Sequence, residues 1–239
     1  MAHLRGRERS RYVTRMFARI SRRYDLLNTV MTAGRHHAWR RMATDAALAD
    51  LSGPALDVAT GTGDLALEMA RTPSVSRVVG LDSTVEMLSV ALRKAQRKGL
   101  APRLSLLVGD AHYLPFPDGH FICAAVGFGV RNFIDPPRAL REMARVVKPG
   151  GRVVVLEIVR TEAESFLGKI LPICFRYATP WLGAVLAGDR DAYSYLPESV
   201  QGFLSAKELA SMMEDAGLSN VRFREVALGS VAIHVGEKG

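Results

Sequence analysis

The sequence predicts an α/β domain built on a mostly parallel seven-stranded sheet, with an antiparallel C-terminal hairpin and a helical insertion. Three observations support this prediction. Short apolar runs alternate with helical patterns from residue 55 onward. The runs are mostly apolar throughout, which is typical of parallel strands covered by helices on both faces. At 239 residues, the chain is long enough to enclose one substantial core of this kind.

The spacing of apolar residues places the elements in chain order. It predicts helices at 8–22, 35–50, 64–71, 84–98, 136–147 and 205–216. It predicts strands at 55–59, 77–81, 104–108, 121–126, 152–157, 220–226 and 229–236. Residues 24–34 connect the first two helices and end in a turn. Lys148-Pro149-Gly150-Gly151 indicates a stop and a turn, and a short turn at Gly229 joins the last two strands.

Two parts of the chain differ from this alternation. We assign residues 1–50 to an N-terminal helical segment and residues 51–239 to the main domain, with a cap insertion at 160–203. The insertion holds an apolar stretch, Phe166 to Ala187, close to the ~20 residues of a membrane span. Two cations and two prolines within it argue against a span. A helical cap over the sheet is the simpler interpretation, and the same segment could form a lid that faces an apolar substrate.

Positive charge is concentrated at the N-terminal end. The chain has a formal net charge of +8, and residues 1–41 contain eleven arginines against one glutamate and one aspartate. A basic amphipathic segment can lie on an anionic membrane surface, bind nucleic acid, or present a solvated helix face. No aromatic platform or nucleic-acid motif accompanies the arginines, so we expect no nucleic-acid partner. The membrane surface and the solvated face stay as alternatives.

Cysteine usage and the N-terminal sequence indicate a compartment. Cys123 and Cys174 lack metal-ligand spacing and are predicted to be buried, reduced thiols. The start of the chain carries no apolar signal-peptide core, so we expect a cytoplasmic protein, with peripheral contact at the inner face of the membrane as an extension of the charge argument. The sequence leaves the oligomeric state open, with a homo-oligomer as one alternative.

The most informative segment is a glycine turn between a strand and a helix, Leu56-Asp57-Val58-Ala59-Thr60-Gly61-Thr62-Gly63-Asp64. This layout brings a bound ligand against the backbone at a helix N-terminus. The spacing also fits a loose dinucleotide fingerprint. However, Asp64 at the helix N-terminus would compete with a phosphate for the same positive field. The acids of this region, Asp57, Asp64, Asp82 and Asp110, instead suit a ligand with an amine, ribose hydroxyls and a sulfonium cation, which is S-adenosylmethionine.

Individual residues can be given roles toward this ligand. Asp82, at the end of the second strand, can accept from both ribose hydroxyls or cap the next helix. Asp110 can accept from the adenine amino group while the N–H of Ala111 donates to the ring, or it can be a turn aspartate. Thr62 can hydrogen-bond the methionine portion. The predicted donor-binding set is Asp57, Gly61, Thr62, Gly63, Asp82, Asp110, Ala111 and Gly127.

A second loop, residues 127–132, follows the fourth strand and is expected to face the methyl donor. Arg131 is the candidate catalytic residue, since a guanidinium near a phenolic oxygen would favour the phenolate and activate the adjacent ring carbon. The alternative is a structural salt bridge with Asp135 or Glu157. His36 or His37 could act as a base, although histidines on helix surfaces are commoner. No metal-binding cluster stands out in the sequence.

Several segments together are similar to the ubiquinone/menaquinone biosynthesis C-methyltransferase family, from about residue 12 to the C-terminus. They are Phe17-x-x-Ile20-x-x-x-Tyr24-Asp25-Leu26-Leu27-Asn28, Trp39-Arg40-Arg41, the glycine turn, Phe128-Gly129-Val130-Arg131-Asn132, Ala139-Leu140-Arg141-Glu142-Met143, Lys148-Pro149-Gly150-Gly151, Tyr193-x-Tyr195-Leu196-Pro197-Glu198-Ser199 and Val231-Ala232-Ile233-His234. The resemblance implies a Rossmann-like, class I S-adenosylmethionine-dependent methyltransferase that methylates a ring carbon of a polyprenylated quinol. It also points to Thr62, Asp82, Asp110 and Ala111 as donor-binding positions.

The resemblance leaves the acceptor open between related substrates. Demethylmenaquinol is the preferred acceptor, with a benzoquinol of the ubiquinone branch as the nearest alternative. A donor-binding scaffold without activity is the alternative from another class. The chain departs from the family pattern at Thr60, where a glycine is usual, and at Gly127, where a serine is common. The second change removes one hydroxyl from the expected donor site.

Overall fold

The computed structural model describes residues 6–161, 199–200 and 202–239. Most of the insertion at 160–203, including its apolar stretch and Cys174, therefore lies outside the described residues. The seven strands form a single sheet in the order β3-β2-β1-β4-β5-β7-β6. The strands are β1 (Gly53–Val58), β2 (Val75–Asp82), β3 (Leu104–Val108), β4 (Phe121–Gly127), β5 (Val147–Ile158), β6 (Leu218–Val226) and β7 (Val231–Lys238).

The first five strands are parallel, and β7 lies antiparallel between β5 and β6. The predicted fold class is confirmed by this topology. The strand order changes direction between β1 and β4, so the connections leave these two strands toward opposite sides. Their carboxyl ends form the kind of crevice in which open α/β sheets bind ligands.

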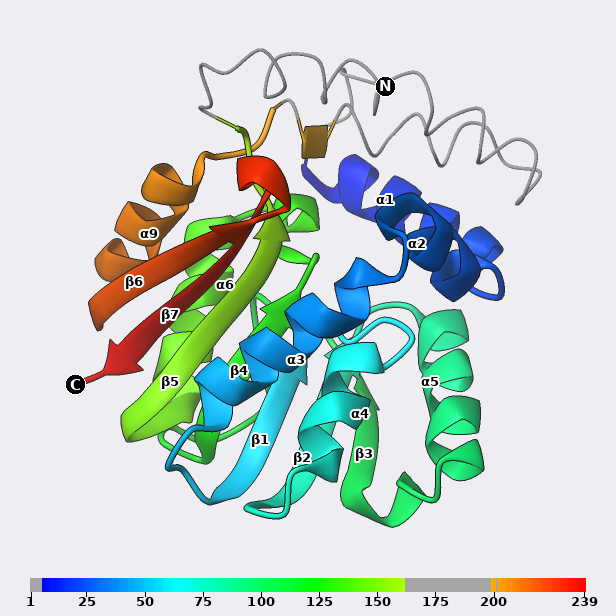
Figure 1. The fold of residues 1–239 in the computed structure, drawn as a ribbon, viewed down its shortest axis with the longest axis horizontal. Coiled ribbons are helices and arrows are strands. Elements are labelled where there is room, and N and C mark those ends of the chain that lie inside the picture. The colour runs from blue at the N-terminus through cyan, green and yellow to red at the C-terminus, as the bar shows by residue number, and fades with distance from the viewer. Residues whose placement is uncertain (1–5, 162–198, 201) are drawn as a thin grey trace.

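Helices cover the sheet on both faces (Figure 1). The helices are α1 (Gly6–Ile20), α2 (Tyr24–Thr32), α3 (Arg35–Leu48), α4 (Asp64–Arg71), α5 (Val85–Arg97), α6 (Pro136–Val146) and α9 (Ala206–Asp215). Trp39 and Ala43 of α3 and Met69 of α4 pack in the core on one face. Leu140 of α6 and Leu209 of α9 pack in the core on the other. This arrangement explains why the central strand β4 is apolar on both sides.

Two local features differ from the sequence prediction. Residues 24–32, expected to be a connection, form the helix α2. Lys148-Pro149-Gly150-Gly151, expected to be a turn outside the strand, is an irregularity within β5. Val147 pairs with Phe121 and Arg152 pairs with Cys123, so four residues loop out opposite one residue of β4. Gly150 in this loop has φ +74°, a conformation that favours glycine.

The N-terminal helices α1 and α2 have a small core of their own. Val13, Met16 and Ile20 on the predicted stripe of α1 pack with Leu27 of α2. This packing explains why residues 24–32 are helical, because a short amphipathic helix is stabilised mainly by tertiary contacts and only weakly by intrinsic helix propensity. Within the described ranges, no helix is both long and apolar enough to cross a membrane. Cys123 is a buried free thiol, as predicted, and burial raises its pKa to about 12.

Candidate functional site: a cavity at the carboxyl ends of the strands

A cavity of about 290 Å³ lies at the carboxyl ends of β1, β2, β3 and β4, beneath α1. Its lining combines two kinds of chemistry. Gly61, Asp82 and Asp110 line it together with the apolar side chains of Leu81, Met87 and Val108. Aromatic side chains from α1, α2 and the loop after β4 also line it, namely Phe17, Tyr24, Phe128 and Phe133. The carboxylates and the exposed backbone suit a nucleoside, and the aromatic side chains suit a flat apolar ring.

The glycine turn is supported from behind by Asp57. This carboxylate is buried and accepts hydrogen bonds from Thr60 Oγ1 at 2.6 Å and from the Ala66 backbone N at 2.9 Å. Burial raises its pKa to about 7, although these hydrogen bonds oppose the shift. Asp57 therefore holds the turn in shape and does not itself line the cavity.

The two glycines of the turn are required for different reasons. Gly61 has φ +56° and its N–H donates to Asp82 Oδ2 at 2.8 Å. Gly63 has φ +81°, and a Cβ atom there would lie 2.9 Å from Cβ of Ala91 on α5. A side chain at Gly63 would thus push α5 away from the turn, so the helix packing as well as the backbone conformation requires glycine.

Asp82 lies where it could serve either of the roles that the sequence suggested for it. It lines the cavity at the end of β2, and its Oδ1 accepts from the backbone N of Thr84 at 2.8 Å, just before α5 begins. Burial raises its pKa, while the backbone donors of Thr84 and Gly61 act in the opposite direction. The carboxylate is therefore held in one orientation at the wall of the cavity, with lone pairs left for a ligand.

Asp110 belongs to a chain of hydrogen bonds that the sequence analysis missed. Its Oδ1 accepts from the backbone N of His112 at 2.9 Å and lies 2.5 Å from His112 Nδ1. His112 Nε2 accepts from the backbone N of Asp135 at 3.1 Å, so the proton of a neutral ring must be on Nδ1. Burial acts to raise the pKa of Asp110, but the bonds from His112 outweigh it and lower the pKa. Ala111 lines the cavity beside this pair.

Thr62 does not line the cavity, in contrast to its predicted role. Its hydroxyl donates to Asp25 Oδ1 at 2.5 Å, and Lys94 Nζ donates to Asp25 Oδ2 at 2.8 Å. Lys94 also bonds Asp64, which lies 3.9 Å from Arg40 Nη2. This network, which we call the α2 clasp (Asp25, Thr62, Asp64, Lys94 and Arg40), joins α2, α3 and α5 to the glycine turn.

His36 belongs to the same region, and hydrogen bonds hold both of its ring nitrogens. Its Nδ1 bonds Arg40, and its Nε2 lies 3.1 Å from Thr29 Oγ1, which donates its own hydrogen to the Asp25 carbonyl. The proton of His36 is therefore on Nε2. Burial and then the nearby Arg40 charge lower the pKa of His36 to about 4, so the ring is neutral and structural. His37 is exposed on α3.

Arg131 forms the buried ion pair that was the alternative to a catalytic role. Its Nη1 lies 2.5 Å from Glu157 Oε1 and donates to the carbonyl of Phe128 at 2.7 Å. Glu157 is fully buried and also accepts from the Arg131 backbone N at 3.2 Å. Arg131 does not line the cavity, so direct contact with a phenolic oxygen, as expected from the sequence, is not what the structure shows.

Two residues that line the cavity have strained backbones. Ala59 after β1 has φ +54° and Phe128 after β4 has φ +61°. A residue other than glycine in this region costs on the order of 1–3 kcal/mol. Gly127 lines the cavity next to Phe128, and a Cβ atom there would lie 3.4 Å from Leu65 Cδ2. The strain is located where the strand order changes, which is where such sheets bind ligands.

The residues present fit S-adenosylmethionine as a ligand. Two fixed carboxylates flank an apolar wall, as ribose hydroxyls and an adenine ring require, and bare backbone at Gly61 allows close approach. No group of three or more His, Cys, Asp or Glu side chains suited to a metal ion occurs in the described part of the chain. The fold and this site together define a class I S-adenosylmethionine-dependent methyltransferase.

Comparison with known proteins agrees with this class and narrows it. The model of the ubiE/COQ5 methyltransferase family matches residues 5–238, so the chain belongs to that family. It is 45% identical over 223 residues to the demethylmenaquinone methyltransferase of Thermus thermophilus, covering 93% of this chain and all of the relative. It is 37% identical over 232 residues to the ubiquinone/menaquinone biosynthesis C-methyltransferase UbiE of Cellvibrio japonicus, covering 97% of this chain and 93% of the relative.

Solved structures with lower identity share the fold. A SAM-dependent methyltransferase of Thermotoga maritima superposes with a TM-score of 0.66 at 21% identity, covering 95% of this chain and all of that one. The [4+2]-cyclase SpnF superposes with a TM-score of 0.64 at 21% identity, covering 84% of this chain and 80% of that one. Because the fold also occurs in a protein named for another reaction, function must be argued from the site.

Proposed function

We propose that the protein transfers the methyl group of S-adenosylmethionine to a ring carbon of demethylmenaquinol, giving menaquinol. The observation that carries this proposal is one cavity, at the point where the strand order changes, whose lining includes both carboxylates and aromatic side chains. The names of the relatives from Thermus thermophilus and Deinococcus radiodurans, both demethylmenaquinone methyltransferases, support the choice of acceptor.

On the donor side, we assign the ribose hydroxyls to Asp82 and the adenine amino group to Asp110, with the N–H of Ala111 donating to the adenine ring. Gly61 and Gly63 shape the turn that approaches the methionine portion, and Asp57 supports it from within. Thr62 supports the same turn through Asp25. When bound, S-adenosylmethionine supplies a methyl group activated by its sulfonium charge.

On the acceptor side, the task of the protein is to hold a ring carbon in line with the methyl–sulfur bond. A π-electron pair of the ring forms the new carbon–carbon bond, while the methyl–sulfur bond breaks and leaves its electron pair on sulfur. The proton on the methylated carbon then leaves to solvent and restores the aromatic ring. Holding the reactants in this geometry can supply several kcal/mol of the barrier reduction.

The benzoquinol of the ubiquinone branch is the nearest rival, since relatives named UbiE cover both pathways. Incubation of the purified protein with labelled donor and each quinol separates the candidates. Transfer to demethylmenaquinol at the higher kcat/KM supports the proposal, and transfer to the benzoquinol alone contradicts it. Donor binding in calorimetry without turnover on any quinol would indicate the scaffold alternative.

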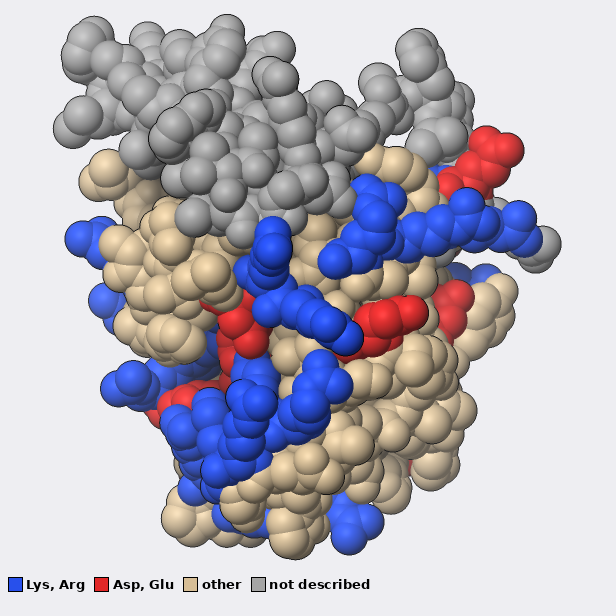
Figure 2. All heavy atoms as spheres, turned by 90° about the vertical axis from the view of Figure 1, so that its right-hand side faces the viewer, with Lys and Arg blue, Asp and Glu red and all other residues tan. Residues whose placement is uncertain are grey.

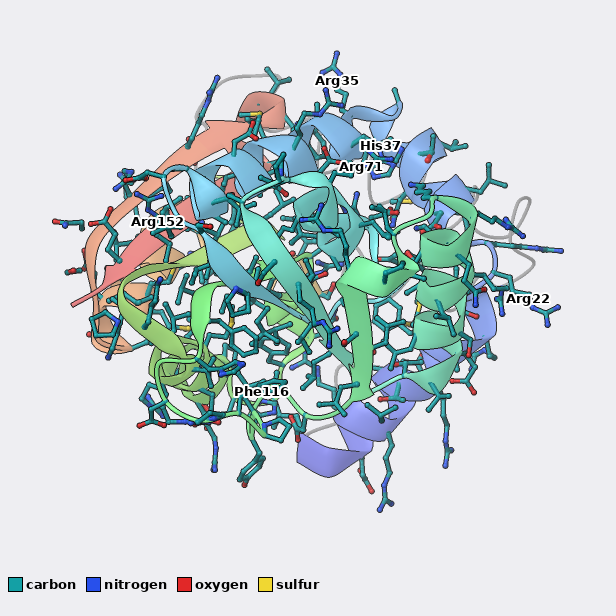
Figure 3. All side chains as sticks on the ribbon, turned by 90° about the horizontal axis from the view of Figure 1, so that it is seen from below. Arg22, Arg35, His37, Arg71, Phe116 and Arg152 are labelled. Atoms are coloured by element: carbon teal, nitrogen blue, oxygen red, sulfur yellow. The ribbon has the colours of Figure 1, made fainter. Side chains whose placement is uncertain are left out.

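We also propose that α1 and α2 contact an anionic membrane surface, where a polyprenylated quinol resides. Leu26 and Val30 lie one turn apart on α2 and are 54% and 44% exposed. Arg22 and Arg23 precede them and are exposed, and Arg22 lies at the outer edge of the molecule (Figure 3). Lys and Arg side chains gather on the face that carries α1, α2 and α5, with acidic side chains among them (Figure 2). Exposed apolar residues beside arginines are typical of interfacial helices.

Liposome sedimentation tests this membrane contact. The double variant Arg22→Glu/Arg23→Glu should bind vesicles containing anionic lipid several-fold more weakly than the parent protein, because it replaces attraction by repulsion near the surface. Arg141→Glu/Arg224→Glu, which makes the same charge change at exposed positions on α6 and β6, is the matched control. Equal loss in both variants, or no loss in the first, would contradict the assignment.

A further inference from the structure

Phe128 combines a strained backbone with a place at the switch point of the sheet. Its φ of +61° is unusual for a bulky side chain, and it follows β4 directly. On the neighbouring strand, Ala59 after β1 has φ +54°. The two loops touch, because a Cβ atom at Gly129 would lie 2.9 Å from Cβ of Ala59. An observed backbone outlier of this kind is a reason to ask what the residue does.

Both polar groups of the Phe128 backbone are held by partners. Its N–H donates to the carbonyl of Leu156 on β5 at 2.7 Å, and its carbonyl accepts from Arg131 Nη1 at 2.7 Å. Arg131 is fixed in turn by the buried carboxylate of Glu157. The buried Arg131–Glu157 pair therefore fixes the backbone of Phe128. This contact gives the ion pair a structural role, although Arg131 does not line the cavity.

The ring of Phe128 is also held from its outer side. The guanidinium carbon of Arg40 lies 5.4 Å from the ring centroid, within the range of a cation–π contact. Arg40 is buried on α3 and bonds His36. Phe128 also lines the cavity, so the same residue contacts Arg40 of the α2 clasp and borders the space open to a ligand.

We propose that Phe128 is a positioning residue that holds the flat quinol ring against the donor methyl group, and that Arg131 acts through Phe128 rather than on the substrate. This inference rests on the proposed function. An aromatic ring can stack on a quinol ring at a centroid distance of 4.5–7 Å in an offset arrangement, which an aliphatic side chain cannot match. A pinned backbone matters because a displacement of about 1 Å can cost ~100-fold in rate.

The first test compares substitutions at Phe128. Phe128→Leu should lower kcat/KM for demethylmenaquinol by about tenfold or more while the Kd for S-adenosylmethionine, measured by calorimetry, stays within about twofold. Phe128→Tyr keeps the stacking face and should retain most of the activity. Phe116→Leu is the matched control, because Phe116 is a half-buried aromatic that packs against the core and does not line the cavity.

The second test is a double-mutant cycle with Arg131→Lys. If Arg131 acts through Phe128, Phe128→Leu/Arg131→Lys should be no slower than Phe128→Leu alone. Multiplication of the two losses would overturn that part of the inference, because it would show that Arg131 affects the reaction independently of the Phe128 ring. If Arg131→Lys does not fold, the comparison of leucine and tyrosine at Phe128 still decides the role of the ring.

The outcomes distinguish this inference from the proposed function. A parent protein that methylates demethylmenaquinol, with Phe128→Leu as active as Phe116→Leu, overturns the inference alone. A parent protein that binds the donor and methylates no quinol overturns the proposed function. Equal losses for Phe128→Leu and Phe128→Tyr would also contradict the inference, because a stacking role requires the tyrosine ring to substitute for phenylalanine.

Discussion

At the scale of single residues, the site depends on carboxylates whose environments differ sharply. Asp57 is buried behind the glycine turn, whereas Asp82 and Asp110 stand at the cavity wall. The sequence could place all three at strand ends, because apolar runs stop there. It could not distinguish the supporting acid from the cavity acids, since that depends on which way each side chain points from neighbouring strands.

Asp57 should make stability depend on pH. Its pKa in the folded protein, about 7, is above the ordinary value of 3.8, so the fold holds a proton that the unfolded chain releases. Stability from this group is therefore present below about pH 4 and is lost as pH rises to about 7. The loss is on the order of 4 kcal/mol at most.

Asp57→Asn tests this directly. Denaturant unfolding at pH 5 and pH 8 should show that the free energy of unfolding changes less with pH in the variant than in the parent protein. The donor Kd should rise, because the amide weakens the hydrogen bonds from Thr60 and Ala66 that hold the turn. An identical pH dependence in both proteins would show that the carboxylate is ionised at little cost.

Asp82 should matter chiefly for donor binding. Asp82→Asn should weaken S-adenosylmethionine binding in calorimetry by about 10- to 100-fold, because a hydrogen bond to a charged group contributes about 1.5–3 kcal/mol. Asp215→Asn, at an exposed acid on α9, is the control. An unchanged Kd for Asp82→Asn would show that the ribose lies elsewhere.

At the scale of elements, the N-terminal helices are tied to the glycine turn. Val13 and Phe17 of α1 line the cavity, and Asp25 of α2 bonds Thr62 and Lys94. The apolar stripe of α1 was visible in the sequence, but α2 was not, because its stability comes from packing and from a clasp to residues 37 and 69 positions away. Local periodicity carries no information about such distant ion pairs.

The α2 clasp should contribute strongly to stability. Lys94→Met leaves Asp25 and Asp64 without their shared cation. Because these pairs are part-buried and Arg40 stays near Asp64, the expected loss is about 1–3 kcal/mol, below the ~3–5 kcal/mol of a fully buried pair. Denaturant unfolding should show that Asp64→Asn/Lys94→Met loses less than the sum of the two single variants. Additive losses would mean that the two groups do not interact in solution.

At the scale of the whole molecule, the fold class and the family could be predicted, because the alternation of elements and several sequence segments along the chain indicate them. The alternation of strands and helices determined the doubly wound sheet, and the segments 127–132 and 231–234 pointed to the family. From the sequence, the ion-pair partner of Arg131 could be narrowed only to Asp135 or Glu157. Glu157 follows from the pairing of Gly127 with Leu156, a register that the sequence does not reveal.

The central claim is that one cavity brings a sulfonium donor and a quinol ring together for transfer to carbon. The most direct test is a single-turnover reaction of the purified protein with methyl-labelled S-adenosylmethionine and demethylmenaquinol, with the product analysed by mass spectrometry and NMR. We predict one labelled methyl group on a ring carbon. Label on an oxygen atom, or no transfer to this quinol by a protein that binds the donor, would contradict the claim.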